Sequence, residues 1–144
     1  MRVIPIIGIG PGDPEYLTLK GLRLLQGAEF VAGFASVLAP LQRFIRGTPL
    51  PMTYKDQDQV LSLLAEKARE GRRCVLCCWG DPSVSASELV ERVRRACGPV
   101  EVVAGVSSVA VACARSGIPL EEALFFTFHQ RDEPQWEEFC GALR

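Results

Sequence analysis

The chain has 144 residues, a length that favours a single domain with a substantial hydrophobic core. Apolar residues make up 48% and charged residues 23%, as in ordinary soluble globular proteins. The net charge of −1 gives no support for a nucleic-acid or anionic membrane surface. No apolar run approaches the length of about eighteen residues that a membrane span needs, and the apolar start is too short for a secretory signal. We therefore expect a cytoplasmic protein.

Apolar runs alternate with amphipathic stretches from residue 3 onward. The spacing of Leu19, Leu22 and Leu25 is that of a helix, and Thr18 before them is a good N-cap. The elements expected in this part are, in chain order, a strand over 3–9 buried on both faces, a helix over 18–26, a short strand over 29–32, a helix over 36–45, and an irregular or briefly extended piece over 49–54.

The middle of the chain repeats the same alternation. Glu88 and Arg92, like Glu91 and Arg95, have the spacing of favourable pairs on a helix surface. The elements expected here are an amphipathic helix over 58–70 closed by Gly71, a strand over 74–79, a helix to Ala96 capped by Ser85 or Ser87, a strand over 100–103, and a helix over 107–115 that ends at Gly117. Strands alternating with helices predict an α/β fold with a parallel sheet and right-handed crossovers.

The segment GIPLEE, residues 117–122, indicates a boundary. After it we expect one strand over 124–128 and one helix over 134–143. A lone strand and helix cannot enclose a core. We therefore assign residues 1–119 to an N-terminal α/β lobe and residues 120–144 to the beginning of a second α/β lobe, inside which the chain is expected to stop.

Six cysteines and one histidine raise the question of a metal site or of disulfides. Cys74 and Cys77 form a C-x-x-C pattern, but they lie in an apolar run of strand length. Residues three apart in a strand face opposite sides and lie about 10 Å apart, beyond the Cα separation of roughly 7 Å that a disulfide allows. No histidine and cysteine set has zinc spacing. We predict buried free thiols and no metal.

Three segments that follow predicted strands differ from generic turns. They are GIGPGDP at 8–14, WGDPSVSAS at 79–87 and AGVSSVAVA at 104–112. Ligands of parallel α/β sheets bind beyond the carboxyl ends of the strands. Because parallel strands share one direction, we expect all three loops at the same edge of the sheet.

The first loop is a poor dinucleotide site. Gly8 and Gly10 fit the G-x-G-x-x-G fingerprint, but Asp13 occupies the third glycine position. Pro11 and Pro14 lack N–H donors, and a carboxylate would repel a diphosphate. A nicotinamide-dependent reductase is therefore a disfavoured alternative, and a tight turn without a ligand is another.

The second and third loops add carboxylate and hydroxyl groups. Asp81 either accepts hydrogen bonds from a ligand or forms only an Asx turn, and Ser107 and Ser108 either contact a ligand or cap a helix. None of the three loops contains a basic residue. This chemistry favours an uncharged or positively charged ligand, such as a nucleoside that carries a sulfonium.

The stretches GIGPGDPEYLT, WGDPSVSAS and AGVSSVAVACARSGIP resemble, in order and spacing, three motifs of the tetrapyrrole methylases. Those enzymes transfer a methyl group from S-adenosylmethionine to ring carbons of corrin and siroheme precursors. Within the family, YKDQDQVLSLL and FFTFHQRDE are most similar to the CbiE type, which methylates C5 of precorrin-6Y or cobalt-precorrin-7. The sequence His129-Gln130-Arg131 departs from the His-Gly-Arg of that type.

The resemblance implies two α/β lobes with S-adenosylmethionine in the cleft between them. Carried over by position, the cofactor-binding residues are Ile9 and Pro11 of the first loop, Gly80, Asp81 and Val84 of the second, and Ser107 and Ser108 of the third. A nucleophilic ring carbon also needs a base that removes a proton, and Asp13 and His129 are weak candidates. For Asp13 the alternative is a helix cap, and for His129 a structural or exposed position.

The resemblance also implies partners. They are a precorrin or cobalt-precorrin substrate, a second copy in a homodimer, and a CbiT-type protein or domain for methylation at C15. The alternatives are another tetrapyrrole methylase of the same fold and a truncated binding or dimerisation module without turnover. A chain that stops inside its second lobe puts activity of the chain on its own in question.

Overall fold

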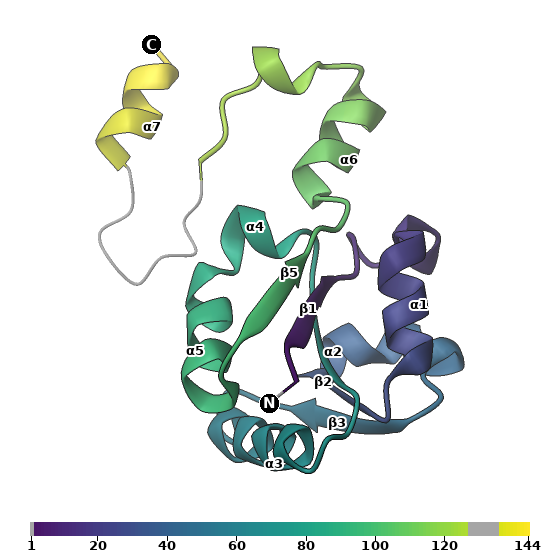
Figure 1. Cartoon of the computed structure of the whole chain (residues 1–144). Helices are drawn as coiled ribbons and strands as arrows, with labels where there is room; N and C mark the ends of the chain where they lie inside the picture. Colours follow the sequence, from purple (N-terminus) through teal and green to yellow (C-terminus); the bar gives the residue numbers. More distant parts are fainter. Residues whose placement is uncertain (1, 127–135) are drawn as a thin grey trace. The chain divides into compact units, whose positions relative to one another are not determined.

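A computed structural model of the chain describes residues 2–126 and 136–144. The chain forms two compact units, Met1–Val111 and Ala112–Arg144. The first unit holds a five-stranded sheet with helices around it (Figure 1). The lobe boundary between residues 119 and 120 stays a prediction.

The sheet of the first unit is parallel throughout its strand pairs, as the alternation of strands and helices predicts. Its order is β3-β2-β4-β1-β5, so β1 lies between β4 and β5. Ile6 of β1 stands opposite Leu76 on one side and Val102 on the other. The strands are β1 (Ile4–Gly8), β2 (Phe30–Phe34), β3 (Thr48–Met52), β4 (Cys74–Cys78) and β5 (Val100–Val103).

Helices cover both faces of this sheet (Figure 1). One core cluster joins alternate strand residues to α3 and α5, and the other joins the residues between them to α1, α2 and η2. The helical elements of the unit are η1 (Pro14–Tyr16), α1 (Leu19–Gly27), α2 (Ala35–Leu38), η2 (Ala39–Phe44), α3 (Gln57–Arg69), α4 (Pro82–Ser85) and α5 (Ser87–Cys97). The fold is therefore a doubly wound α/β sheet, and the carboxyl ends of all five strands lie at the same end of the sheet.

Strand β4 is buried on both faces and shows the expected alternation. Cys74, Leu76 and Cys78 lie in the cluster beneath α3 and α5, whereas Val75 and Cys77 lie in the opposite cluster. The two cysteines of the C-x-x-C pattern thus face away from each other, as predicted. All six cysteines are free, and they are buried at positions 74, 77, 78 and 97, partly buried at 113 and exposed at 140.

Two helices differ from the sequence-based expectation. The helix predicted over 36–45 is divided into α2 and η2, because Pro40 has no N–H for an α-helical bond. The predicted cap at Ser85 or Ser87 is wrong, since Ala86 is the N-cap of α5 and makes no side-chain bond. By contrast, Thr18 caps α1 as predicted, with its Oγ1 accepting a hydrogen bond from Gly21 N at 3.0 Å.

The remaining elements are α6 (Ser108–Ser116), η3 (Leu120–Glu122) and α7 (Trp136–Ala142). Helices α6 and α7 match the helices predicted over 107–115 and 134–143. The strand predicted over 124–128 is wrong where the structure describes it, because residues 124–126 are not in a strand. Their sequence has the apolar pattern of a strand but no described neighbour to pair with. His129 and the rest of the predicted strand lie outside the described residues. Within the described ranges, no helix has the length and apolar character needed to cross a membrane.

Candidate functional site

The first two loops are joined by main-chain hydrogen bonds. Gly10 N donates to Gly80 O at 3.1 Å, and Gly80 N donates back to Gly10 O at 2.8 Å. Ile9 N donates to Cys78 O at 3.0 Å just before this bridge. The loops that follow β1 and β4 therefore form one continuous rim.

The third loop closes against this rim through two glycines. A Cβ atom on Gly8 would lie 2.5 Å from Gly80 O and 2.9 Å from Gly105 N. A Cβ atom on Gly105 would lie 2.6 Å from Gly8 O. Side chains do not approach other atoms so closely, so only glycine permits this packing. The expectation that all three loops share one edge is confirmed.

Gly80 has a different environment. Its φ of +62° is a conformation that favours glycine, and the nearest atoms to a Cβ at this position would be Ser108 N at 3.9 Å and Ser107 Cα at 4.0 Å. A Cβ there would thus make only ordinary van der Waals contacts with the residues that begin α6, and Gly80 itself is partly exposed. A ligand can approach the main chain there.

Asp81 combines a structural role with a free oxygen. Its Oδ1 accepts hydrogen bonds from Ser83 N at 3.0 Å and from Ser83 Oγ at 2.7 Å, which is the Asx-turn alternative considered above. Among the described residues, no donor forms a hydrogen bond with the other carboxylate oxygen of Asp81, Oδ2. Asp81 therefore starts α4 and still has an oxygen for a hydroxyl or an amine.

Asp13, a candidate base, is an exposed cap. Its Oδ1 accepts a hydrogen bond from Glu15 N at 2.9 Å at the start of η1. The helix-cap alternative thus describes its observed contacts. The other candidate, His129, lies outside the described residues.

The apolar residues of the first two loops are exposed to different degrees. Ile9 is 1% exposed and packs in the core beneath α1, so it presents almost no surface to a ligand, whereas Pro11 is partly buried. Val84 and Trp79 are 43% and 45% exposed, and the Trp79 ring lies 3.6 Å from where a Cβ on Gly12 would be. Sequence reasoning missed Trp79 because it continues the apolar run of the strand; its place directly before the Gly-Asp-Pro triplet was the available signal.

The two serines of the third loop divide their roles. Ser107 Oγ accepts a hydrogen bond from Val109 N at 3.2 Å and is partly buried. Ser108, the first residue of α6, is exposed. Ser107 is therefore the cap, and the Ser108 hydroxyl is the one better placed for a ligand.

The three loops lie at the carboxyl ends of the strands, a region called the three-loop edge below, and its electrostatics disfavour binding of phosphate. Loops 8–14, 79–87 and 104–112 contain two carboxylates and no lysine, arginine or histidine. Pro11, Pro14 and Pro82 have no N–H groups. Among the described residues, no group of acidic, histidine or cysteine side chains could hold a metal ion. The edge suits a neutral or cationic ligand with polar groups.

The thiols below the loops are not nucleophiles. Burial raises the pKa of Cys77 and of Cys78 to about 12, and the nearby Asp81 carboxylate adds to the effect at Cys78. Both side chains therefore stay protonated near neutral pH, and thiolate chemistry is absent from the end of β4.

Comparison with known proteins decides the family. The sequence matches the family of tetrapyrrole (corrin/porphyrin) methylases over residues 3–143. The chain belongs to the tetrapyrrole methylases. This is a family of methyltransferases that use S-adenosylmethionine. That cofactor carries no phosphate, which agrees with the lack of phosphate-binding groups in the three loops.

Individual tetrapyrrole methylases show the likeness in detail. The chain is 37% identical over 128 residues to a siroheme synthase of Methylococcus capsulatus, covering 81% of this chain and 27% of that protein. The uroporphyrin III C-methyltransferase of Thermus thermophilus, solved with S-adenosylhomocysteine, aligns with a TM-score of 0.65 and 37% identity over 83% of this chain and 53% of that one. The chain thus spans about a quarter of that curated relative and about half of that solved structure.

The CbiE type within the family has weaker support. The precorrin-6Y methylase CbiE of Archaeoglobus fulgidus aligns with a TM-score of 0.69 but 23% identity, over 88% of this chain and 65% of that one. This likeness shows the shared fold alone. The finer resemblance to CbiE that the motifs indicate is therefore not the one that these comparisons favour.

Proposed function

We propose that the three-loop edge binds S-adenosylmethionine and that the protein transfers the methyl group to a ring carbon of a tetrapyrrole. The observation that carries this proposal is the Gly10–Gly80 bridge, which holds the partly exposed main chain of Gly80 beside carboxylate and hydroxyl groups. Membership of the family and the S-adenosylhomocysteine complex of the Thermus thermophilus relative support it.

The residues at this edge fit the proposed cofactor. The partly exposed main chain of Gly80 is accessible to the ligand, Asp81 Oδ2 accepts from a hydroxyl or an amine, and the Ser108 hydroxyl approaches from the third loop. Val84 and Pro11 give apolar contact, and the buried Ile9 supports the first loop from the core.

Catalysis at such a site rests on orientation. When bound, S-adenosylmethionine supplies a methyl group on a positively charged sulfur, which a carbon nucleophile accepts in line at about 3–3.5 Å. The three loops would hold the donor between them, because Gly8 and Gly105 let their main chains pack closely together. Without a basic residue in the three loops, the sulfonium meets no like charge there.

For the substrate we propose a uroporphyrinogen III-type tetrapyrrole. The support is the greater identity to siroheme synthase and uroporphyrin III C-methyltransferase than to CbiE, 37% against 23%. C5 methylation of precorrin-6Y is the second candidate, and it rests on the motifs YKDQDQVLSLL and FFTFHQRDE. The homodimer and the CbiT-type partner stay predictions.

Incubation with tritiated S-adenosylmethionine and either uroporphyrinogen III or precorrin-6Y tests this function. We expect label, and a mass increase of one methyl group or more, in the uroporphyrinogen product. Label in precorrin-6Y alone would reassign the protein to the CbiE type. Binding of S-adenosylhomocysteine with no transfer to either substrate would favour the module without turnover.

A further inference from the structure

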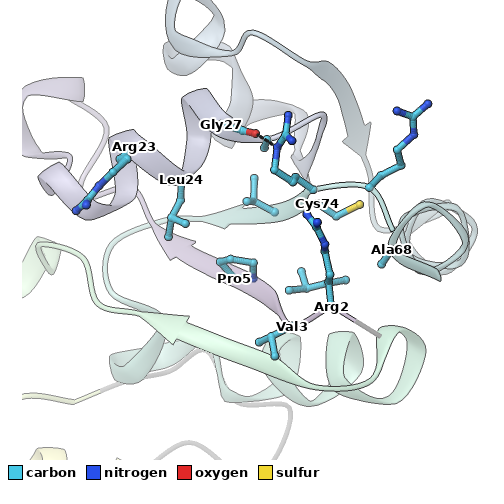
Figure 2. Close-up of a pocket in the computed structure, with 13 residues that line it drawn as sticks. Arg2, Val3, Pro5, Arg23, Leu24, Gly27, Ala68 and Cys74 are labelled. Carbon is cyan, nitrogen blue, oxygen red and sulfur yellow. Dashed lines mark hydrogen bonds between the residues drawn. The ribbon is translucent and has the colours of Figure 1, made fainter. Parts of the chain in front are cut away.

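A cavity lies at the opposite ends of the strands from the three loops, where β1 and β4 begin. Figure 2 shows this cavity, which has a volume of about 200 Å³. It is formed by the start of β1, the second half of α1 and the connection from α3 to β4. The five residues of β1, at about 3.3 Å each, separate it by roughly 16 Å from the three-loop edge. It is therefore distinct from the proposed cofactor site.

The walls of this cavity are apolar. Pro5 belongs to β1, Val3 to the segment before it, and Leu24 to α1 (Figure 2). Val75 of β4 also lines the cavity. Val3 is 50% exposed, which is unusual for a valine beside a central strand. The cavity thus leaves apolar surface in water that an apolar ligand would cover.

The ionisable side chains around these walls are mainly cationic. The cavity is lined by Arg2, Arg23, Arg72 and Arg73, and no acidic residue lines it. Glu29 stands beside it and pairs with Arg72 at 2.8 Å and with Arg73 at 4.0 Å. One carboxylate therefore balances one of four guanidinium groups, although the whole chain has a net charge of −1.

Two of the arginines are held in place and two are not. Arg73 Nε donates to Gly27 O at 2.7 Å, the dashed line in Figure 2, so it is fixed against the end of α1. Among the described residues, the Arg2 and Arg23 side chains form no ion pair or hydrogen bond. Arg2 reaches from the start of β1 toward Cys74 on β4, across the cavity (Figure 2). Its guanidinium is available to a ligand.

We propose that this cavity binds a small organic carboxylate with an apolar body. Guanidinium groups bind carboxylates through paired, charge-assisted hydrogen bonds, and the apolar walls favour an aromatic or branched aliphatic body. An inorganic anion would leave the walls uncovered, and a neutral compound of the same shape would leave Arg2 without its partner. Arg2 is the main contact, and Arg23 at the rim adds charge.

Amide chemical shifts of the ¹⁵N-labelled chain test this site with benzoate as the probe, benzamide as its neutral counterpart and inorganic phosphate as a purely polar anion. We expect saturable benzoate shifts at Val3, Gly27 and Val75, and roughly tenfold weaker binding of benzamide and of phosphate. Arg2→Gln should weaken benzoate binding by about the same factor. The matched control is Arg95→Gln, which removes the same charge from the outer face of α5, where Arg95 is 79% exposed.

Each outcome decides the proposal. It is overturned if benzoate shifts none of these amides, if benzamide binds equally well, or if Arg95→Gln weakens binding as much as Arg2→Gln. Because Arg2 is exposed and unpaired within the described chain, its variant is expected to fold, and the same spectra verify this. S-adenosylhomocysteine binding is not involved, so failure here leaves the proposed methyl transfer untouched.

Discussion

At the scale of single residues, the glycines of the three loops serve two purposes. Gly8 and Gly105 pack against main-chain atoms of the neighbouring loops and allow the rim to close. Gly80 is partly exposed, a Cβ there would meet no atom closer than 3.9 Å, and its φ of +62° is a left-handed conformation. A substitution at Gly8 should therefore mainly lower the stability of the fold. A substitution at Gly80 should mainly lower the affinity for the ligand.

Gly8→Ala should destabilise the protein by about 1–3 kcal/mol, because the new methyl group meets Gly80 O, Pro82 Cδ and Gly105 N within 3.0 Å. Gly27→Ala is the control, since nothing lies within 4 Å of a Cβ there, and it should be neutral or stabilising by roughly 0.5–1 kcal/mol. Urea unfolding measures both. Equal midpoints for the two variants would contradict the packing argument.

Gly80→Ala should weaken S-adenosylhomocysteine binding by about tenfold or more, equivalent to roughly 1.4 kcal/mol, because the methyl group occupies the space proposed for the ligand. Gly117→Ala is matched to it in backbone strain, with φ of +66° against +62°, and has nothing within 4 Å of its Cβ. Isothermal titration should show unchanged affinity for this control. A similar loss in both variants would point to strain rather than to a site at Gly80.

At the scale of elements, prolines account for the clearest limits of sequence reasoning. β3 has the sequence TPLPM, and its two prolines disfavour a strand by the usual rules. The strand forms because it lies at the edge of the sheet and pairs only with β2, which no local pattern reveals. Likewise, a periodic apolar pattern over 36–45 did not show where Pro40 ends the α-helical bonds of α2.

The two predicted helix caps provide a matched pair of substitutions. Thr18→Ala should cost about 1 kcal/mol, because it removes the hydrogen bond from Gly21 N to Thr18 Oγ1. Ser87→Ala should change the stability little, since α5 begins without a side-chain cap. Thermal and urea unfolding compare the two. A larger loss for the serine variant would contradict the observed start of α5.

The thiols of β4 and α5 make stability fall at alkaline pH. Burial raises the folded-state pKa of Cys77 and Cys78 to about 12 and of Cys97 to about 11, from 9.0. Above pH 9 the unfolded chain releases these protons and the folded chain does not, so this contribution is complete below pH 9 and is lost as pH rises toward 12.

Each of these thiols should lower the unfolding free energy by about 1.4 kcal/mol per pH unit within that range. Urea unfolding between pH 8.5 and 10, below the titration of most lysines, measures the slope. Cys140→Ser serves as the control because Cys140 is exposed, and it should leave the slope unchanged. A flat profile over this range would contradict the burial of the three thiols.

At the scale of the whole molecule, the most useful prediction from sequence was the meeting of three loops at one sheet edge. This prediction required only the rule that parallel strands share one direction. In the structure the segments after β1, β4 and β5 do lie next to one another. Contacts that depend on side-chain placement were beyond it. The exposure of Trp79 had only its place before the Gly-Asp-Pro triplet as a signal, and the cationic cavity at the opposite ends of the strands has no local signature, because it is formed by segments far apart in the chain.

The most direct test of this account is titration of the ¹⁵N-labelled chain with S-adenosylhomocysteine and, separately, with NADPH. We predict saturable shifts of the amides of Gly10, Gly80 and Ser108 with S-adenosylhomocysteine and none at these positions with NADPH. Shifts of Gly10 and Gly80 by NADPH, with no response to S-adenosylhomocysteine, would contradict the central claim that this edge binds a sulfonium nucleoside rather than a diphosphate.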